Sequence, residues 1–319
     1  MATAVQAVST KRSFFQTPTG LVLKRFLKRR FAVICLVIIL AMYFMGVFSN
    51  FIAPYGYNQM DITHVRQGPS LSHWFGTDFG GRDLLSRIIY GLRSTVIVTI
   101  ITVLLGSLLL GVVLGAVAGY KGGIFEAIIM RIGDILLAFP SLLLVIILAA
   151  TVKPRVLGLN HWIEDHTFIK GLTSTGVTDY IVIFGALSII SWVGMARLVR
   201  GQILSIKKEE YVMAAIAIGA TDAHIIKTHI LPNVLSQIIV VLSGTLGAIA
   251  LSEASLSFLG IGVQPPTPSL GNLLTGGSVS LLQANSHLVF FPAATVAVLL
   301  FCFNIVGDAV NDAVNPRTR

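Results

Sequence analysis

Few residues in this chain of 319 have the types and spacing that catalysis or metal binding requires. The densest group is His161, Glu164, Asp165 and His166, whose ligand atoms would come near one another on a helix in an outer loop, as a divalent cation needs. Nothing else along the chain joins this group, and a solvated amphipathic loop explains the same pattern. We therefore expect no metal site and no catalytic residue.

A single acid in an apolar stretch is the second candidate. Glu253 follows Ser252 in the segment LSEASLSF, which begins at Leu251. An ionisable group in hydrocarbon is costly, so this side chain should face protein or water and not lipid. Two interpretations stay open, namely the lining of a transport pathway and a hydrogen bond to a neighbouring helix.

The chain carries no motif for nucleotide chemistry. No Gly-x4-Gly-Lys-Ser/Thr sequence occurs, and the glycines at 80 and 81 lack the strand-loop-helix context of a phosphate cradle. We expect no cofactor bound by this chain. An intramembrane enzyme would need a nucleophile, a base or metal ligands within the apolar segments, where the seven His residues do not gather. An ion-coupled secondary transporter would need ionisable groups in broken helices, a description that only Glu253 approaches.

The elements that position these residues are long apolar segments. Hydrophobic residues make up 55% of the chain, charged residues only 12%, and the mean hydropathy is +0.84, whereas a soluble domain is about 25% charged. About 20 apolar residues in a helix cross a bilayer. The sequence predicts an all-α integral membrane protein with six transmembrane helices, near residues 31–49, 94–119, 133–152, 179–198, 235–258 and 287–306.

Orientation follows from the positive residues in the short loops. With the amino terminus inside, most of the 23 Lys and Arg residues flank the spans on the cytoplasmic side. This places both termini and the loop 209–233 in the cytoplasm. Nucleic-acid binding is a rival use of the formal charge of +9, but the basic residues flank spans and are not interleaved with exposed aromatics, so we expect no nucleic-acid partner.

The predicted organisation is one membrane domain with polar ends. Residues 1–30 form a tail and a basic interfacial helix in contact with lipid, 31–49 the first span, and 50–93 an outer segment. Residues 94–308 form a core of five spans, and 309–319 a cytoplasmic tail.

Three small features complete the prediction for the spans. Gly111, Gly115 and Gly119 put small residues on one helix face, where another backbone can approach. Pro140 should kink the third span. Cys35 and Cys302 each lie inside a span and are most simply apolar packing residues.

A polar interruption between the fourth and fifth spans stands out. In residues 209–233, a pair of alanines, a glycine four residues later and a closing Leu-Pro indicate two short helices around a turn. Gly219 allows the turn, and Pro232 should end the second helix before the fifth span. We interpret this segment as a docking element.

The same residues carry a resemblance. Ala214-Ala215-x3-Gly219 with Leu231-Pro232 resembles the cytoplasmic EAA loop of ABC importer permeases. The blocks at 73–78, 81–87, 90–93 and 252–272 are similar to the second permease subunit of the dipeptide/oligopeptide/nickel branch. Two departures occur, because Met213 stands where the family has its acidic residue and Leu270 where it usually has Trp. Glu209 and Glu210, one helical turn earlier, are possible substitutes for the acid.

The resemblance implies a type I, MetI-like permease fold with cytoplasmic coupling helices. It implies a homologous second permease subunit, two ABC ATPase subunits that hold ATP and Mg, and an extracytoplasmic substrate-binding protein, in a bacterial or archaeal plasma membrane. Peptides are the expected substrate, with nickel chelates, glutathione or another small solute as alternatives. The ATPase-coupling residues that it implies are Glu209, Glu210, Tyr211, Ala214, Ala215, Gly219, Ala220, Thr221, Asp222, His229, Leu231, Pro232 and Asn233.

Overall fold

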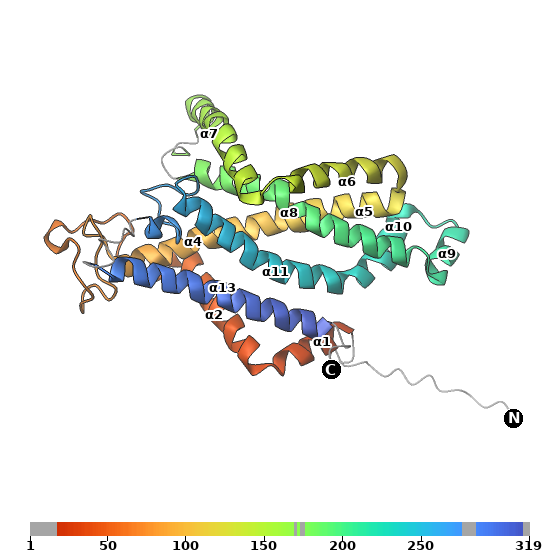
Figure 1. The fold of residues 1–319 in the computed structure, drawn as a ribbon, viewed down its shortest axis with the longest axis horizontal. Helices are drawn as coiled ribbons and strands as arrows, with labels where there is room; N and C mark the ends of the chain where they lie inside the picture. Colours follow the sequence, from red (N-terminus) through yellow and green to blue (C-terminus); the bar gives the residue numbers. More distant parts are fainter. Residues whose placement is uncertain (1–17, 169–170, 173–175, 276–284, 315–319) are drawn as a thin grey trace.

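The computed structural model describes residues 18–168, 171–172, 176–275 and 285–314, and in these ranges the chain is almost entirely helical (Figure 1). The only extended pairing among them is an isolated antiparallel bridge between Thr77 and Asp83. The helices in chain order are α1 (Pro18–Leu27), α2 (Arg30–Val47), α3 (Ser49–Ile52), η2 (Ile62–His64), α4 (Leu84–Thr102), η3 (Val103–Gly111), α5 (Val112–Lys121), α6 (Gly123–Ala138), α7 (Ser141–His166), α8 (Val177–Ile206), α9 (Glu210–Ala217), α10 (Asp222–Ile225), η4 (Ile226–Ile230), α11 (Leu231–Phe258), η5 (Asn272–Leu274) and α13 (His287–Val314).

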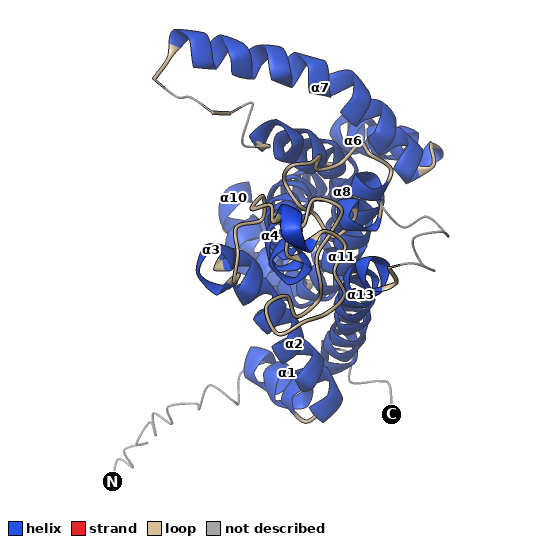
Figure 2. Ribbon diagram, turned by 90° about the vertical axis from the view of Figure 1, so that its left-hand side faces the viewer, coloured by secondary structure: helices blue, strands red, loops and turns tan. Residues whose placement is uncertain are grey.

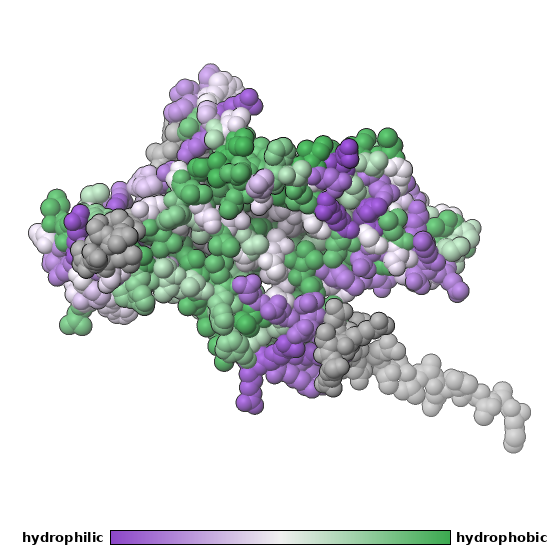
Figure 3. Space-filling model, in the orientation of Figure 1, coloured by the Kyte–Doolittle hydropathy of each residue, from purple (hydrophilic) through white to green (hydrophobic). Residues whose placement is uncertain are grey.

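Six of these helical segments are long and apolar enough to cross a membrane, which confirms the predicted fold class. They are Arg30–Val47, Leu84–Lys121, Ser141–His166, Val177–Ile206, Ile226–Phe258 and His287–Val314. Hydrophobic side chains gather over the middle of these helices, and hydrophilic ones toward the side that carries α1 and α9 (Figure 3). The polarity of the surface thus matches a protein embedded in lipid.

The second span begins ten residues earlier than predicted. α4 starts at Leu84, runs through the π-helical stretch η3 and continues as α5 to Lys121. The prediction began the span at 94 because Arg87 and Arg93 interrupt the apolar pattern. Arg87 is nevertheless buried, since its guanidinium pairs with the Asp78 carboxylate.

Pro140 separates two helices, so the prediction of one kinked span over 133–152 is wrong. α6 ends at Ala138, Phe139 is extended (φ −95°, ψ 145°), and α7 begins at Ser141. Proline disfavours helical backbone in the residue before it, which explains the break. α7 then continues to His166 through the predicted outer loop and points away from the other helices (Figures 1 and 2).

The small-residue face of the second span packs on α8, as the sequence predicted. A methyl group added at Gly111 would lie 2.6 Å from Cβ of Met195, and one at Gly115 would lie 2.6 Å from the Ala196 carbonyl oxygen. Gly119 approaches Arg200 of α8 in the same way. These glycines therefore allow close contact between two helices.

The largest cluster of buried apolar residues joins α2, α4, α11 and α13. Cys35 and Cys302 are both buried in it, as predicted for apolar packing residues. At one end of the same helices Arg29 pairs with Asp312 at 2.8 Å, and Arg25 donates to the Ala313 carbonyl at 3.3 Å. These contacts hold α1 against the end of α13.

Candidate functional site

The segment predicted to dock is a helical hairpin at one end of the molecule, where α9 and α10 project beyond the spans (Figure 1). α9 ends at Ala217, and Gly219 in the turn that follows has left-handed backbone (φ +82°). The Gly219 amide donates to the Ile216 carbonyl at 3.0 Å, and the Ala220 amide donates to the Ala215 carbonyl at 3.1 Å. This pair of bonds is a Schellman motif, which explains why glycine stands at the turn. The predicted turn is confirmed. We call residues 209–233 the hairpin.

The hairpin is packed onto the ends of the spans. Val212, Ala215 and Ile225 are buried in one cluster with Met195 and Ile203 of α8. Burial of such side chains contributes about 1.5–3 kcal/mol for each of the larger ones. The hairpin and α8 therefore share one buried core.

Polar contacts fasten the base of the hairpin. The Tyr120 hydroxyl, at the end of α5, donates to Asp222 at 3.0 Å. Lys207 Nζ donates to the Tyr120 carbonyl oxygen at 2.8 Å and lies 4.9 Å from the centre of the Tyr120 ring. Asp222 is thus the acid that connects the hairpin to a span.

Glu209 and Glu210 have no such role in the structure. Glu209 precedes α9, and its side chain makes no capping hydrogen bond. Both acids are exposed, as are Ala214 and Thr221.

The second half of the hairpin differs from the prediction. α10 passes through the π-helical turn η4 directly into α11, and Pro232 lies in the first turn of α11. Pro232 therefore does not end a helix. The π-helical turn η4 stands immediately before α11, so the regular α-helical ladder is already interrupted where Pro232 offers no N–H.

His229, Asn233 and Tyr211 connect the two halves of the hairpin. Asn233 Nδ2 donates to the His229 carbonyl at 2.7 Å and to the Tyr211 hydroxyl at 3.2 Å. The rings of Tyr211 and His229 lie 6.1 Å apart. Leu231 packs against the buried cluster beneath. The structure thus brings together three residues, Tyr211, His229 and Asn233, that were predicted for the coupling loop.

Large apolar side chains are exposed on α9 and at the residue that follows it. Met213, Ile216 and Ile218 are all exposed, and Ile218 has 85% of its surface accessible. We call these three residues the hairpin face. Large apolar side chains grouped at a polar end of a molecule indicate an interaction surface.

Glu253 is fully buried between two spans. Its carboxylate accepts hydrogen bonds from the Thr95 hydroxyl of α4 at 2.9 Å and from the Ser257 hydroxyl at 3.0 Å. Of the two interpretations drawn from the sequence, the structure bears out the bond between helices. Ser252 donates to the Ala248 carbonyl at 2.8 Å, and its side chain borders a cavity of about 190 Å³ between α7, α8 and α11.

Residues 161–166 are not among the groups of three or more potential metal ligands that the described residues form. His166 Nδ1 bonds to the Trp162 carbonyl at 2.8 Å, and the two rings stack with centres 4.8 Å apart. Among the described residues, the set of three side chains that could share one ion is a different one, Asp61, His64 and His73.

An ion-pair network in the outer segment was missed by the sequence analysis. The Asp78 carboxylate accepts from Arg82 Nε at 2.8 Å and pairs with the buried Arg87. The Asp83 carboxylate caps α4 by accepting from the Ser86 amide at 2.7 Å. The sequence does contain a pattern that could have indicated this network. Within residues 78–87 two acids alternate with two arginines, and a turn followed by the start of a helix can bring the opposite charges together.

Comparison with known proteins agrees with this geometry. Residues 111–319 match the family described as the binding-protein-dependent transport system inner membrane component. Residues 17–69 match the N-terminal transmembrane domain of oligopeptide transport permease C. The chain therefore belongs to this family of transport permeases and is a multi-pass inner-membrane protein.

Individual relatives cover most of the chain. It is 38% identical over 93% of its length to the dipeptide transport system permease protein DppC of Bacillus subtilis, covering 85% of that protein. It is 36% identical over 92% of its length to the oligopeptide transport system permease protein OppC of the same organism, covering 88%. It is 35% identical over 95% of its length to the glutathione transport system permease protein GsiD of Escherichia coli, covering 92%.

Proposed function

We propose that this chain is a transmembrane subunit of an ATP-driven importer and forms half of a translocation pathway for di- or oligopeptides. The relatives named as dipeptide and oligopeptide permeases support the substrate class. A homologous permease subunit supplies the other half of the pathway. A binding protein outside the membrane delivers the peptide.

ATP and Mg belong, in this proposal, to two partner ATPase subunits and not to this chain. The partners seat on the hairpin face, formed by Met213, Ile216 and Ile218. Closure of the ATPase pair moves the hairpin as a rigid body, because its buried residues are continuous with α5, α8 and α11. The spans then change their tilt and open the pathway to the other side.

The main support for this proposal is that one short hairpin has both an exposed apolar face and a second side that is buried against the spans. The exposed residues provide a surface for a partner, and the contacts of Asp222 and Ala215 link that surface to the spans. The orientation of the chain in the membrane is part of this proposal. The hairpin, both termini and the basic residues of α1 lie in the cytoplasm, as the distribution of positive charge favours.

Association with the ATPase subunits tests the proposal. We expect Ile218→Asp to abolish co-purification of the ATPase subunits, because a charge would be desolvated in an apolar contact. The side chain is 85% exposed in the isolated chain, so folding and membrane insertion should not change. Ile62→Asp is the matched control, since Ile62 is 84% exposed in the outer segment. Normal co-purification of Ile218→Asp would remove the docking role of the hairpin face.

Glutathione is the second candidate substrate, because a relative named as a glutathione permease is nearly as similar as the peptide permeases. Uptake by the reconstituted importer, with its own binding protein, separates the two. Dipeptide uptake that excess glutathione does not inhibit supports the first candidate, and the reverse pattern supports glutathione.

A further inference from the structure

The outer segment between α3 and α4 holds a cluster of side chains that transport does not explain. It lies at the end of the molecule opposite the hairpin (Figure 1). Its members are Asp61, before the short helix η2, His64 at the end of η2, and His73 in the following loop. One ligand atom from each residue lies within 4.8 Å of the other two.

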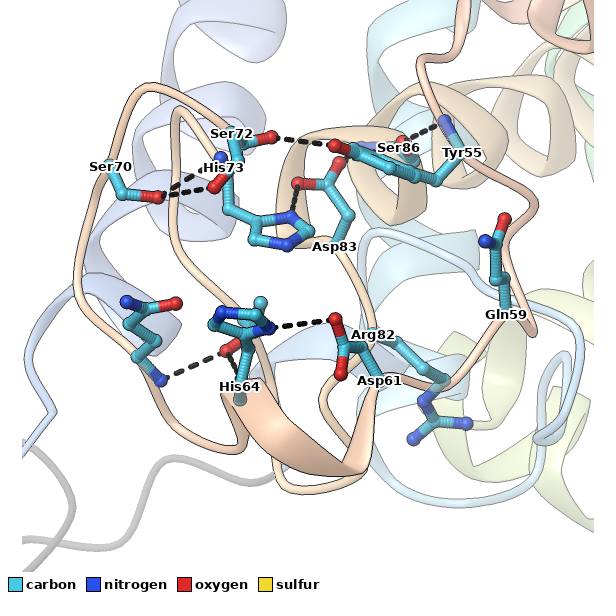
Figure 4. A network of polar contacts seen from close by, with 12 residues as sticks. Tyr55, Gln59, Asp61, His64, Ser70, Ser72, His73, Arg82, Asp83 and Ser86 are labelled. Carbon is cyan, nitrogen blue, oxygen red and sulfur yellow. Dashed lines mark hydrogen bonds and ion pairs between the residues drawn. The ribbon is translucent and has the colours of Figure 1, made fainter.

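The His73 ring lies above the His64 ring in Figure 4, with the two ring planes tilted by 54°, and the Asp61 carboxylate lies beside the His64 ring. The centres of the rings are 6.0 Å apart. The His73 ring is buried, whereas the side chains of His64 and Asp61 are about 40% exposed. The cluster therefore has one buried side, at His73, and one side that is open to solvent, at His64 and Asp61.

His73 is oriented as a metal ligand would be. Its Nδ1 donates to Asp83 Oδ1 at 3.0 Å, which leaves Nε2 as the atom that can bind an ion. Asp83 is itself fixed, because its Oδ2 accepts from the Ser86 amide and hydroxyl, both at 2.7 Å. A carboxylate that holds the second nitrogen of a histidine is the usual outer partner of a metal ligand, and it makes the ligand more basic.

The backbone around Asp61 and His64 is fixed as well. The Thr77 hydroxyl donates to the His64 carbonyl, and the Asp61 amide donates to the Gly81 carbonyl at 3.3 Å. A side chain at Gly81 would collide with the Asp61 carbonyl, so glycine is required there. The ligands are thus placed by contacts that do not depend on an ion.

The charge of Asp61 suits a cation. The Asp61 carboxylate is held in place by hydrogen bonds from the Thr63 amide at 3.0 Å and from His64 Nδ1 at 2.7 Å. Arg82, the cation drawn nearby in Figure 4, is paired with Asp78 at 2.8 Å. A cavity of about 180 Å³, bordered also by Tyr55 and Gln59, leaves room for water beside the three ligands.

We propose that Asp61, His64 and His73 bind one divalent transition-metal ion of the Zn²⁺ class, with water in the remaining position. Two imidazole nitrogens and one carboxylate oxygen are a ligand set that Zn²⁺ accepts, whereas Ca²⁺ and Mg²⁺ prefer oxygen alone. The hydrogen bond between His64 Nδ1 and Asp61 Oδ2, whose atoms lie 2.7 Å apart, gives way to bonds to the ion, and the neutral imidazole then carries its one proton on Nε2. The bound ion cross-links η2 to the loop before α4. The proposal does not rest on the transport function.

Zinc binding to the full-length chain tests the site. The chain is purified in detergent without a polyhistidine tag, treated with EDTA, and titrated with Zn²⁺ against a chromophoric chelator. We expect one Zn²⁺ per chain, with the affinity reduced more than tenfold in His64→Ala and in Asp61→Asn. Both side chains are partly exposed, so neither variant removes a buried contact.

His166→Ala is the matched control, because His166 is exposed on α7 and belongs to the other histidine group. It should bind Zn²⁺ as the parent chain does. Co²⁺ in place of Zn²⁺ should give the visible absorption of a four- or five-coordinate site in the parent chain and lose it in His64→Ala, and Ca²⁺ in large excess should not compete. Absence of stoichiometric binding, unchanged binding in His64→Ala, or an equal loss in His166→Ala would overturn the proposal.

Discussion

At the scale of single residues, the buried acid Glu253 shows how an expensive group is kept in a membrane. Each carboxylate oxygen accepts a hydroxyl, one from Thr95 on another helix and one from Ser257 on its own. The carboxylate thus links α4 to α11 in a medium that offers no water. A proton relay would need further titratable groups in contact with the carboxylate, whereas the two hydrogen bonds that it accepts in the described part of the chain come from hydroxyl groups.

We predict that Glu253→Leu lowers the stability of the detergent-solubilised chain by about 1–3 kcal/mol, because two buried hydroxyls lose their acceptor. Glu253→Gln, which keeps an acceptor, should lose less. Thermal unfolding followed by size-exclusion chromatography measures both. Ser255→Ala is the control, since its hydroxyl bonds only to the Leu251 carbonyl of its own helix, and a drop in that variant equal to the drop in Glu253→Leu would contradict the explanation.

At the scale of elements, the contact between the second span and α8 depends on glycine. Backbone and side-chain atoms of α8 lie within about 3 Å of the place where a methyl group would stand at Gly111, Gly115 and Gly119. The stretch η3 continues this approach with Gly106, which faces Ser188. In the proposed function, this close packing is the route by which a motion of the hairpin reaches the spans.

We predict that Gly115→Ala destabilises the chain by about 1–3 kcal/mol, since the methyl group would overlap the Ala196 carbonyl and α8 would have to shift. Gly158→Ala in α7 meets no atom within 4 Å and should be neutral or slightly stabilising. Thermal unfolding of the two variants side by side makes the comparison. Equal stability of both would mean that the helices do not need the close contact.

Much of the element structure could be predicted from the sequence, and the exceptions have physical causes. The six spans followed from apolar runs because lipid leaves the backbone no other choice than a helix. The turn at Gly219 followed from residue type, since left-handed backbone favours glycine. Pro140 and Pro232 were wrongly interpreted because the effect of a proline depends on the backbone before it, which is extended at Phe139 and π-helical in η4.

The ion pair of Arg87 with Asp78 and the contact of His64 with His73, both in the outer segment, could not be predicted in the same way. Arg87 looked like a charge that ends a span, and its burial depends on Asp78, which a tight loop brings back against α4. His64 and His73 are separated by a loop without periodicity, so no spacing rule places one ring over the other. Contacts of this kind appear only when the loop is folded.

At the scale of the whole molecule, the two polar ends differ in composition and so in their proposed partners. The hairpin end carries the apolar hairpin face and the basic helix α1. The opposite end carries the folded outer segment, with its ion pairs and the Asp61 cluster. The proposed function, in which cargo arrives on one side and mechanical work on the other, accounts for this division.

Labelling with a membrane-impermeant thiol reagent should confirm the orientation. Cys35 and Cys302 are both 2% exposed, so the parent chain gives little background. With the chain expressed without its partners, we expect Ile218→Cys to react only in inside-out vesicles. Leu71→Cys, at a residue fully exposed in the outer segment, should react only in right-side-out vesicles. The opposite pattern would place the hairpin outside the cytoplasm and contradict the proposed function.

The central claim is that the hairpin passes the motion of the ATPase subunits to the spans, and ATP-driven peptide uptake by the complete importer in proteoliposomes tests it most directly. Gly219 is left-handed, a conformation that asparagine tolerates and valine does not. We predict that Gly219→Val lowers uptake roughly tenfold, the factor that corresponds to ~1–2 kcal/mol of strain, while ATP hydrolysis continues. Gly219→Asn should retain most of the uptake. Full uptake by Gly219→Val, or an equal loss of uptake in both variants, would contradict the account.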